Sequence, residues 1–260
     1  MPRDTGPHGD ETQCTRTAAP TAYAATGRAQ AVTVPVEAVR HYEQLLTAWS
    51  TQGMQGVTLA TMLEVARSSV PYDEARRLAW SFARACTQFS DAECVLSTLW
   101  SRAQTVDERH EAMVVLGFAA AWHGVAARGI DYLKLIITEQ TARPEPSPRH
   151  MVGAYQNLAT LYAMEQQWQE SLYAAQQAIA WWERGRPGQH TCSRAGVETT
   201  LVEALANAGH YAEAEQRLLA LLESGAVDRA SYEGMLRGIR FYRMTPDARD
   251  WSHPVITRRY

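Results

Sequence analysis

The chain has 260 residues, enough for one large domain or for one solenoid with a continuous core. It is 46% hydrophobic and 20% charged, which is ordinary for a soluble protein, and no run of apolar residues is long enough to span a membrane. The net charge of −3 gives no global attraction toward nucleic acid or an anionic membrane surface.

The first part of the chain carries little structural signal before a helical pattern begins. Residues 1–34 are rich in Thr, Ala, Gly and Pro and show no apolar period, so we expect them to be disordered. Order is predicted to begin at Pro35, with a first helix whose apolar face extends from Val36 to Trp49 and which ends at Gly53. A second helix stops before Pro71, and its inner face is formed by Leu59, Met62, Leu63 and Ala66.

Two further helical pairs follow. The first runs from Tyr72 to Arg102, and Ser90 is expected to cap its second helix. The second pair opens at Asp107 and turns at Gly124, and a Pro-rich loop follows it. The inward positions of the two pairs are Leu78, Ala79, Phe82, Cys94, Val95, Leu99, Ile130, Leu133 and Ile136 or Ile137.

The chain then repeats the design twice more and ends in a single helix. Ser147-Pro148 is typical of a helix start, and the fourth pair extends through Trp181-Trp182 to the glycine–proline breaker at 185–188. The fifth pair runs from Ser193 to Glu223 with its turn at Ala208-Gly209. A last helix over Arg229–Arg243 has Tyr232, Met235, Leu236, Ile239 and Tyr242 on one side.

Aligning the turns reveals a repeat. The first helices of the pairs carry a recurring dipeptide at spacings of 33, 38, 42 and 43 residues, and periods in this range are typical of stacked helical units. The dipeptides are Leu45-Leu46, Leu78-Ala79, Leu116-Gly117, Leu158-Ala159 and Leu201-Val202. An inward residue follows each of them: Trp49, Phe82, Ala120, Tyr162 and Leu205.

This pattern resembles the tetratricopeptide repeat, in its divergent bacterial forms. The residues that carry the resemblance are Leu116-Gly117, Gly124 and Gly129; Asn157-Leu158-Ala159, Tyr162, Trp168 and Ala178; and Leu201, Leu205, Gly209-His210-Tyr211 and Ala214. The resemblance implies an all-α protein, a right-handed α-solenoid of about five helical hairpins with a C-terminal capping helix. It divides the chain into a disordered extension (1–34), a repeat domain (35–228) and a capping helix with its tail (229–260).

In such a solenoid the first helices line a concave groove that binds a partner. The positions predicted to face it are Arg76, Trp80, Arg84, Val114, Phe118, Trp122, Gln156, Thr160, Thr199 and Glu203, with Asn157 as a candidate contact to a peptide backbone. Its middle is apolar and aromatic, which suits an amphipathic helix or an extended apolar segment.

Alternatives remain open for several of these residues. A register error of one residue would place Trp80, Phe118 and Trp122 in the core. Asn157 is equally suited to bracing its own hairpin, and of Trp181 and Trp182 one is expected in the core and the other partly exposed. The arginine-rich segment after Arg237 is read as a solvated cap, with contact to phosphate or an acidic protein as the alternative.

No pattern of enzyme chemistry is present. None of the eight histidines has a metal-ligand spacing, and His110-Glu111 is read as a solvated first turn of a helix. The chain has no phosphate-binding glycine loop and no nucleophile elbow, and the paired carboxylates Asp91/Glu93 and Glu213/Glu215 fall on polar helix faces. We therefore expect no catalytic residue, no metal and no cofactor.

The cellular setting is inferred from composition. The N-terminal sequence lacks the apolar run of a secretory signal, which predicts a cytoplasmic protein. Lys134 is the single lysine, and we interpret the preference for arginine as high-GC codon usage, typical of bacteria. The cysteines are predicted to be reduced thiols, because no framework spacing relates Cys14, Cys86, Cys94 and Cys192.

Together these features predict a non-enzymatic adaptor or regulator that binds another protein or a peptide. It resembles the sensor modules of bacterial regulators and signalling-peptide receptors. The alternative is a chaperone or assembly factor for a secreted or multi-subunit partner. No membrane or nucleic-acid partner is expected, and the sequence favours no oligomeric state.

Overall fold

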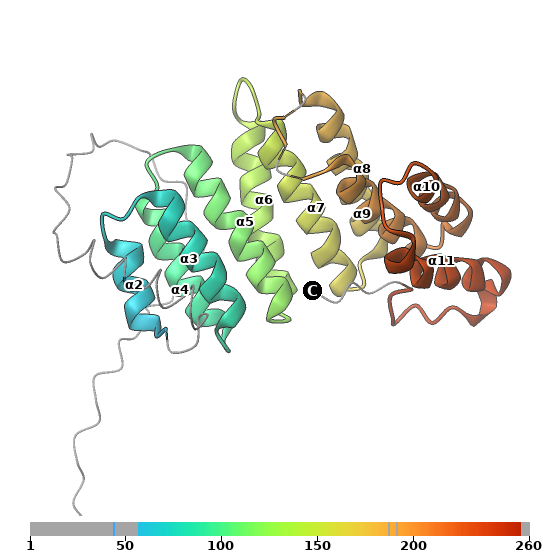
Figure 1. Ribbon diagram of the computed structural model, residues 1–260, viewed down its shortest axis with the longest axis horizontal. Helices are drawn as coiled ribbons and strands as arrows, with labels where there is room; N and C mark the ends of the chain where they lie inside the picture. Colours follow the sequence, from blue (N-terminus) through green and yellow to red (C-terminus); the bar gives the residue numbers. More distant parts are fainter. Residues whose placement is uncertain (1–43, 45–56, 187, 191, 256–260) are drawn as a thin grey trace, which may run out of the picture. The chain divides into compact units, whose positions relative to one another are not determined.

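The computed structural model describes residues 44, 57–186, 188–190 and 192–255. Residues 1–34, Pro35, Gly53 and all of the first predicted helix except the helical Gln44 lie outside this part of the chain. The described residues form helices and no strand. The helices are α2 (Leu59–Arg67), α3 (Tyr72–Ala85), α4 (Phe89–Arg102), α5 (Val106–Trp122), α6 (Ala126–Thr141), α7 (Pro148–Met164), α8 (Trp168–Arg184), α9 (Arg194–Asn207), α10 (Tyr211–Glu223), α11 (Arg229–Met244) and the short 3-10 helix η1 (Pro246–Ala248) (Figure 1).

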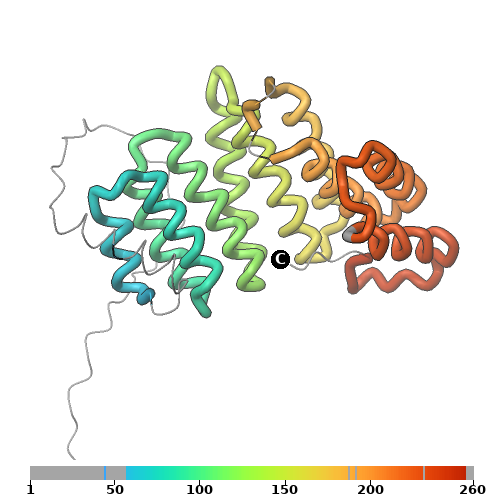
Figure 2. The backbone as a smooth tube through the Cα atoms, viewed as in Figure 1, coloured from blue at the N-terminus to red at the C-terminus, as the bar shows by residue number. Residues whose placement is uncertain are grey.

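Consecutive helices pair as hairpins, α3 with α4, α5 with α6, α7 with α8 and α9 with α10. Each hairpin also packs on the next, through α4 on α5, α6 on α7 and α8 on α9, and α11 packs on α10. Figure 2 shows the backbone running back and forth from one helix to the next. The predicted all-α stack of hairpins with a final helix is therefore confirmed for the described residues.

The core consists of the apolar side chains that the periodicity placed inward. Leu78, Ala79 and Phe82 of α3 are buried, as are Leu158 of α7 and Leu201 of α9. One large cluster of buried side chains extends over α2 to α5, and a second extends from α5 to α11. Helix α5 belongs to both clusters, so the two halves of the stack share one helix.

Two glycines allow α5, α6 and α7 to approach closely. A Cβ atom on Gly117 of α5 would lie 2.9 Å from a methyl carbon of Leu133 on α6. A Cβ atom on Gly129 of α6 would lie 2.7 Å from both Ala120 of α5 and Leu161 of α7. These small residues, singled out by the repeat, thus lie where the neighbouring helices leave no room for a side chain.

The helix ends follow the expected local chemistry with one correction. Gly124, Gly209 and Gly225 adopt positive φ after α5, α9 and α10, as a left-handed helix end requires. Helix α4 begins at Phe89 after Gln88, so the prediction that Ser90 caps it is wrong. The Ser90 hydroxyl instead donates to the side-chain oxygen of Gln88.

A capping box at the start of α5 was not predicted. The Thr105 hydroxyl accepts from the backbone N–H of Glu108 at 3.1 Å, and the Glu108 carboxylate accepts from the N–H of Thr105 at 3.1 Å. The two residues have the spacing of a reciprocal cap, which satisfies donors that a helix start leaves free.

A buried hydrogen-bond chain links α5, α6 and the start of α7. The backbone N–H of Ser147 donates to Oε1 of Gln140, and Nε2 of Gln140 donates to Nδ1 of His110, both at 2.7 Å. The proton of His110 therefore lies on Nε2, which donates to Glu139 at 2.7 Å. His110 is fully buried, so its prediction as a solvated first-turn residue is wrong.

His150 of α7 packs edge-on against His110, with ring centroids 5.5 Å apart. Both its ring nitrogens are buried without a hydrogen-bond partner, and Asp107 lies 3.7 Å from Nδ1. Burial lowers the pKa of His150 to about 4, against the opposing effect of Asp107. Burial also lowers the pKa of His110, so both rings are neutral near pH 7.

The segment after α11 is tied back onto the stack by Arg249. Its guanidinium lies over the rings of Trp168, Tyr242 and Trp251, at 5.6, 5.7 and 4.8 Å from their centroids. The backbone N–H of Val255 donates to Oδ1 of Asn207 at 2.7 Å. Arg249 is therefore buried as part of the fold. The prediction of a solvated arginine-rich cap is wrong for this residue.

Two more arginines of this region pair within the stack. Arg240 and Arg243 of α11 contact the Glu215 carboxylate of α10 at 2.7 and 2.5 Å. Glu215 is buried, so its prediction as a residue of a polar, solvent-facing side of the helix is wrong. Two of the basic charges of the C-terminal region are thus paired with a carboxylate of α10 and help to hold α11 against it.

The cysteines differ from one another. Cys86 and Cys192 are free thiols, whereas Cys94 is disulfide-bonded. The prediction of reduced thiols is therefore wrong for Cys94. Spacing along the chain could not show this, because a disulfide depends on which segments meet in space.

We predict opposite effects for alanine at two helical glycines. Gly129→Ala places a methyl group against Ala120 and Leu161 and should destabilise the fold by about 1–3 kcal/mol. Gly153→Ala in α7 meets nothing within 4 Å and should stabilise it by about 0.5–1 kcal/mol, because glycine loses more backbone entropy in a helix. Urea unfolding measures both, and equal effects would contradict the close approach.

We also predict that stability falls in mild acid because of His150. Its folded pKa of about 4 lies below the ordinary 6.5, so the unfolded chain binds more protons between these values. The contribution is complete above pH 6.5 and is lost toward pH 4, with a slope of up to about 1.4 kcal/mol per pH unit. The unfolding free energy of wild type should fall relative to that of His150→Leu as the pH is lowered from 6.5 toward 4. An unchanged difference would contradict the assignment, and the exposed His210→Gln serves as control.

Candidate partner-binding surface

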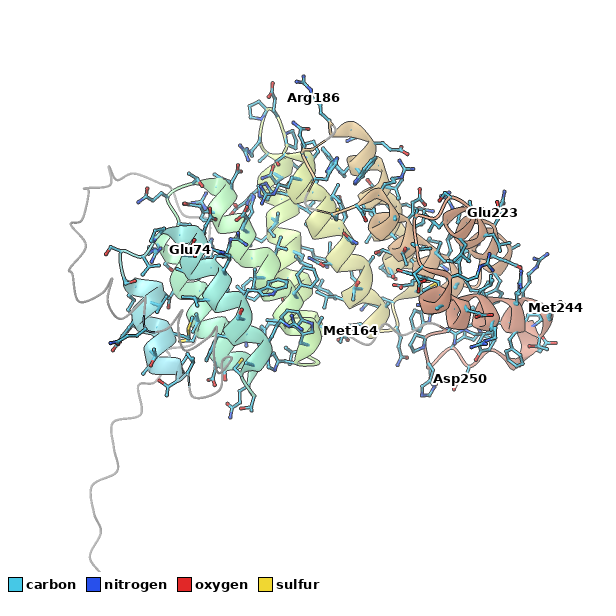
Figure 3. The ribbon with its side chains drawn as sticks, in the orientation of Figure 1. Glu74, Met164, Arg186, Glu223, Met244 and Asp250 are labelled. Atoms are coloured by element: carbon cyan, nitrogen blue, oxygen red, sulfur yellow. The ribbon has the colours of Figure 1, made fainter. Side chains whose placement is uncertain are left out.

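The first helices of successive hairpins form one layer. Helix α3 packs on α5, α5 on α7 and α7 on α9, whereas α4, α6, α8 and α10 have at most weak contacts with one another. The first helices therefore lie on the more closely packed side of the stack. We call the outer surface of these four helices the A-helix face. Figure 3 shows Glu74 near the amino end of α3 and Met164 at the carboxyl end of α7.

An aromatic cluster formed by Trp80, Phe118 and Trp122 lies on this face. The centroid of the Trp80 ring is 5.3 Å from that of Phe118 and 5.2 Å from that of Trp122, both edge-on. Phe118 and Trp122 stack with centroids 6.1 Å apart. Because Phe118 and Trp122 are four residues apart on α5, they lie on the same side of that helix.

The three rings are neither fully buried nor fully exposed. Trp80 and Trp122 pack with one part against the core cluster of α2 to α5, while the inward positions are occupied by Leu78, Phe82 and Leu116. The register that would place all three aromatic rings inside the core is therefore not adopted. Each ring retains surface that a partner can contact.

Arg84 completes this cluster. It lies one turn after Trp80 on α3, is exposed, and places its guanidinium carbon 5.5 Å from the ring centroid of Trp122. The ring face attracts the cation. Four of the predicted site residues are thus brought together from two neighbouring hairpins.

Charged groups occupy the amino end of the face. Arg76 of α3 and Arg149 of α7 both pair with Glu111 of α5, at 2.9 and 2.5 Å, and Asp73 lies 3.5 Å from Arg76. Only Arg76 was predicted here. Glu111 and Arg149 were missed, because an ion pair between residues 38 apart has no local sequence signal.

The remaining predicted residues lie farther along the face. Gln156 of α7 donates to the carbonyl of Gly196 at 3.3 Å and to the Thr200 hydroxyl at 3.2 Å, joining α7 to α9. Thr160 is half-buried one turn later. The side chain of Gln156 is thus engaged within the stack.

Two predicted positions offer little surface. Asn157 is 6% exposed and Thr199 is fully buried, so neither reaches a partner on this face without rearrangement. Val114 is half-buried against the core. The fifth-unit position Glu203 is half-buried and takes part in interactions of its own.

A second aromatic patch lies at the end of α8. Trp182 stacks on His190 with centroids 5.1 Å apart, and Arg194 lies over Trp182 at 5.1 Å. Arg184 lies over Trp181 at 4.5 Å. Both tryptophans are half-buried, so the expectation that one of them is a core residue is wrong.

Cys86 and His123 meet near Arg84, at the carboxyl ends of α3 and α5. The Sγ atom of Cys86 lies 3.7 Å from Nε2 of His123, but that nitrogen also lies 3.1 Å from the carbonyl oxygen of Ala83. A carbonyl only accepts, so Nε2 carries the proton and cannot take one from the thiol. Burial raises the pKa of Cys86, which disfavours the thiolate that nucleophilic catalysis needs.

The described residues show no sign of a metal site or of a membrane-crossing helix. No three or more His, Cys, Asp or Glu side chains gather there as a metal site requires. None of the helices in that part of the chain combines the length and apolarity needed to cross a membrane.

Comparison with known proteins gives little further information. No family model matches the chain, and no curated protein matches it. Among solved structures it is similar to Bacillus thuringiensis PlcR, crystallised with the peptide PapR7 and DNA. The identity is 14% and the TM-score 0.47, over 82% of this chain and 75% of that chain. At this level of similarity, the complex with the peptide and DNA describes PlcR and not this chain.

We predict that the aromatic cluster is energetically coupled. A double-mutant cycle with Trp80→Ala and Phe118→Ala should give a coupling of about 0.5–1.5 kcal/mol in unfolding free energy, because the rings meet edge-on. Tyr173 is an exposed aromatic on α8 and supplies the control pair with Trp80. Additive effects for Trp80 and Phe118 would contradict the observed contact.

Proposed function

We propose that this chain is a non-enzymatic adaptor or regulator that holds another protein or a peptide on its A-helix face. The observation that supports the proposal is the aromatic cluster of Trp80, Phe118 and Trp122, which two neighbouring hairpins hold in contact at the surface. Aromatic side chains with fixed positions are the usual energetic centre of protein interfaces.

The cluster is suited to this role because its backbone is rigidly placed. Leu78 and Leu116, on the opposite sides of α3 and α5, are buried in the core. A partner therefore does not have to order these helices when it binds, and less of the interaction energy is lost as conformational entropy. The exposed part of each ring provides apolar area that becomes buried only in a complex.

A photo-crosslinking amino acid at position 118 tests the proposal in the native organism. We expect a specific crosslinked complex from position 118 and none from position 173, the exposed aromatic position on α8. The partner identified by mass spectrometry should then bind Trp122→Glu about 30-fold more weakly or worse, because an anchor ring contributes about 2 kcal/mol or more.

Two controls make this result decisive. Circular dichroism must show that Trp122→Glu is folded, and Tyr173→Glu should bind the partner as wild type does. Equal binding by folded Trp122→Glu and wild type would exclude the A-helix face as the binding surface. Crosslinks from position 173 alone would have the same consequence.

A further inference from the structure

We propose that the segment held on the A-helix face is acidic, with a carboxylate next to the apolar side chain that covers the aromatic cluster, and that Arg84 pairs with this carboxylate. This inference rests on the proposed function and specifies the chemistry of the partner. It follows from the arginines of the A-helix face, some of which pair with carboxylates of the chain while Arg84, within the part that the structure describes, does not.

Arg84 is exposed and has no carboxylate partner among the described residues. Three other arginines near the amino end of this face behave differently, since Arg76 and Arg149 share Glu111 and Arg77 pairs with Glu74. Asp73 also lies close to Arg76, so each of these three arginines has a carboxylate beside it. The uncompensated positive charge therefore lies at the Arg84 end, beside the aromatic cluster.

The charge of Arg84 affects which partner can bind, because binding would remove water from its guanidinium. An apolar side chain that covers Trp122 also removes water from Arg84, whose guanidinium lies 5.5 Å from that ring. A guanidinium that loses water without gaining an anion is strongly unfavourable. A partner with a carboxylate at this point compensates the loss, whereas a partner with a lysine or arginine there is repelled.

The geometry favours a single carboxylate. Arginine can stack on an aromatic ring and still donate from the edge of its planar group, so pairing need not disrupt the contact with Trp122. Arg76 lies eight residues before Arg84 on α3, about 12 Å along the helix, and it is already paired. One available arginine fits an Asp or Glu side chain, while phosphate sites usually combine several donors.

A random peptide library displayed on phage, selected on the full chain, provides the probe. Clones are kept if they bind wild type and fail to bind folded Trp122→Ala, a variant that adds no charge beside Arg84. We expect Asp or Glu to be enriched next to an apolar or aromatic residue in these clones. A synthetic peptide from the set should bind Arg84→Gln roughly 10-fold more weakly, as the loss of a charge-assisted hydrogen bond implies.

Arg184→Gln is the matched control, because Arg184 also lies over a tryptophan ring but belongs to α8, outside the A-helix face. This variant should bind the peptide as wild type does. Replacing the acidic residue of the peptide with its amide should weaken binding to wild type by the same factor and leave binding to Arg84→Gln unchanged. Selection on Arg84→Glu should enrich Lys or Arg in place of Asp or Glu.

The outcomes separate this inference from the proposed function. Trp122-dependent clones without acidic enrichment, or with unchanged affinity for Arg84→Gln, would overturn the acidic partner and leave the binding surface standing. If no selected clone depends on Trp122, both proposals fail.

Discussion

The close contact of three helices at Gly129 fixes which side of α5 faces the core, and the candidate surface depends on that orientation. Ala120 of α5 and Leu161 of α7 both meet α6 at this glycine, so the side of α5 that carries Ala120 must face inward. Residues of a helix are about 100° apart, so positions two before and two after Ala120 point away from that contact. Phe118 and Trp122 are those positions. The aromatic cluster is therefore at the surface because of a packing requirement on the opposite side of the helix.

Buried polar groups then connect one hairpin to the next. Arg102 of α4 donates to the carbonyls of Ser68 and Val70 at 2.5 Å, which satisfies acceptors just beyond the end of α2. In the hydrogen-bond chain from Ser147 through Gln140 to His110, the side-chain amide of Gln140 accepts one hydrogen bond and donates another. Both of these sets of bonds join neighbouring units, as expected for a stack in which each repeat mainly contacts its neighbours.

Local sequence patterns predicted the helices well because a helix depends on residues three and four positions apart. The core residues Leu78, Phe82 and Leu158 and the turn glycines Gly124 and Gly209 follow directly from that spacing. The capping box at Thr105 and Glu108 was visible in the sequence and was missed. The start of α4 was misplaced because a serine near a helix end often caps it, but here Gln88 occupies that position.

The site was harder to predict because its contacts join different hairpins. Trp80 and Phe118 are far apart in the sequence, and their contact depends on the register of α3 against α5, which periodicity leaves uncertain by a residue. Similarity to a repeat motif singled out Asn157, yet this side chain is buried. A motif match shows that a position belongs to the repeat, but its exposure depends on how the neighbouring helices pack.

The same packing explains why charge, more than shape, would select a partner in the proposed role. Core contacts on the inner sides of α3 and α5 leave the aromatic cluster little freedom to rearrange, and an apolar surface accepts many apolar side chains with similar energy. Discrimination between partners then requires a charged or polar group whose burial is unfavourable unless the partner supplies an oppositely charged or hydrogen-bonding group. Arg84 is such a group, because any side chain that covers Trp122 also takes water from its guanidinium. The rigid stack supplies the contact area, and the unbalanced charge beside it limits which segments can use that area.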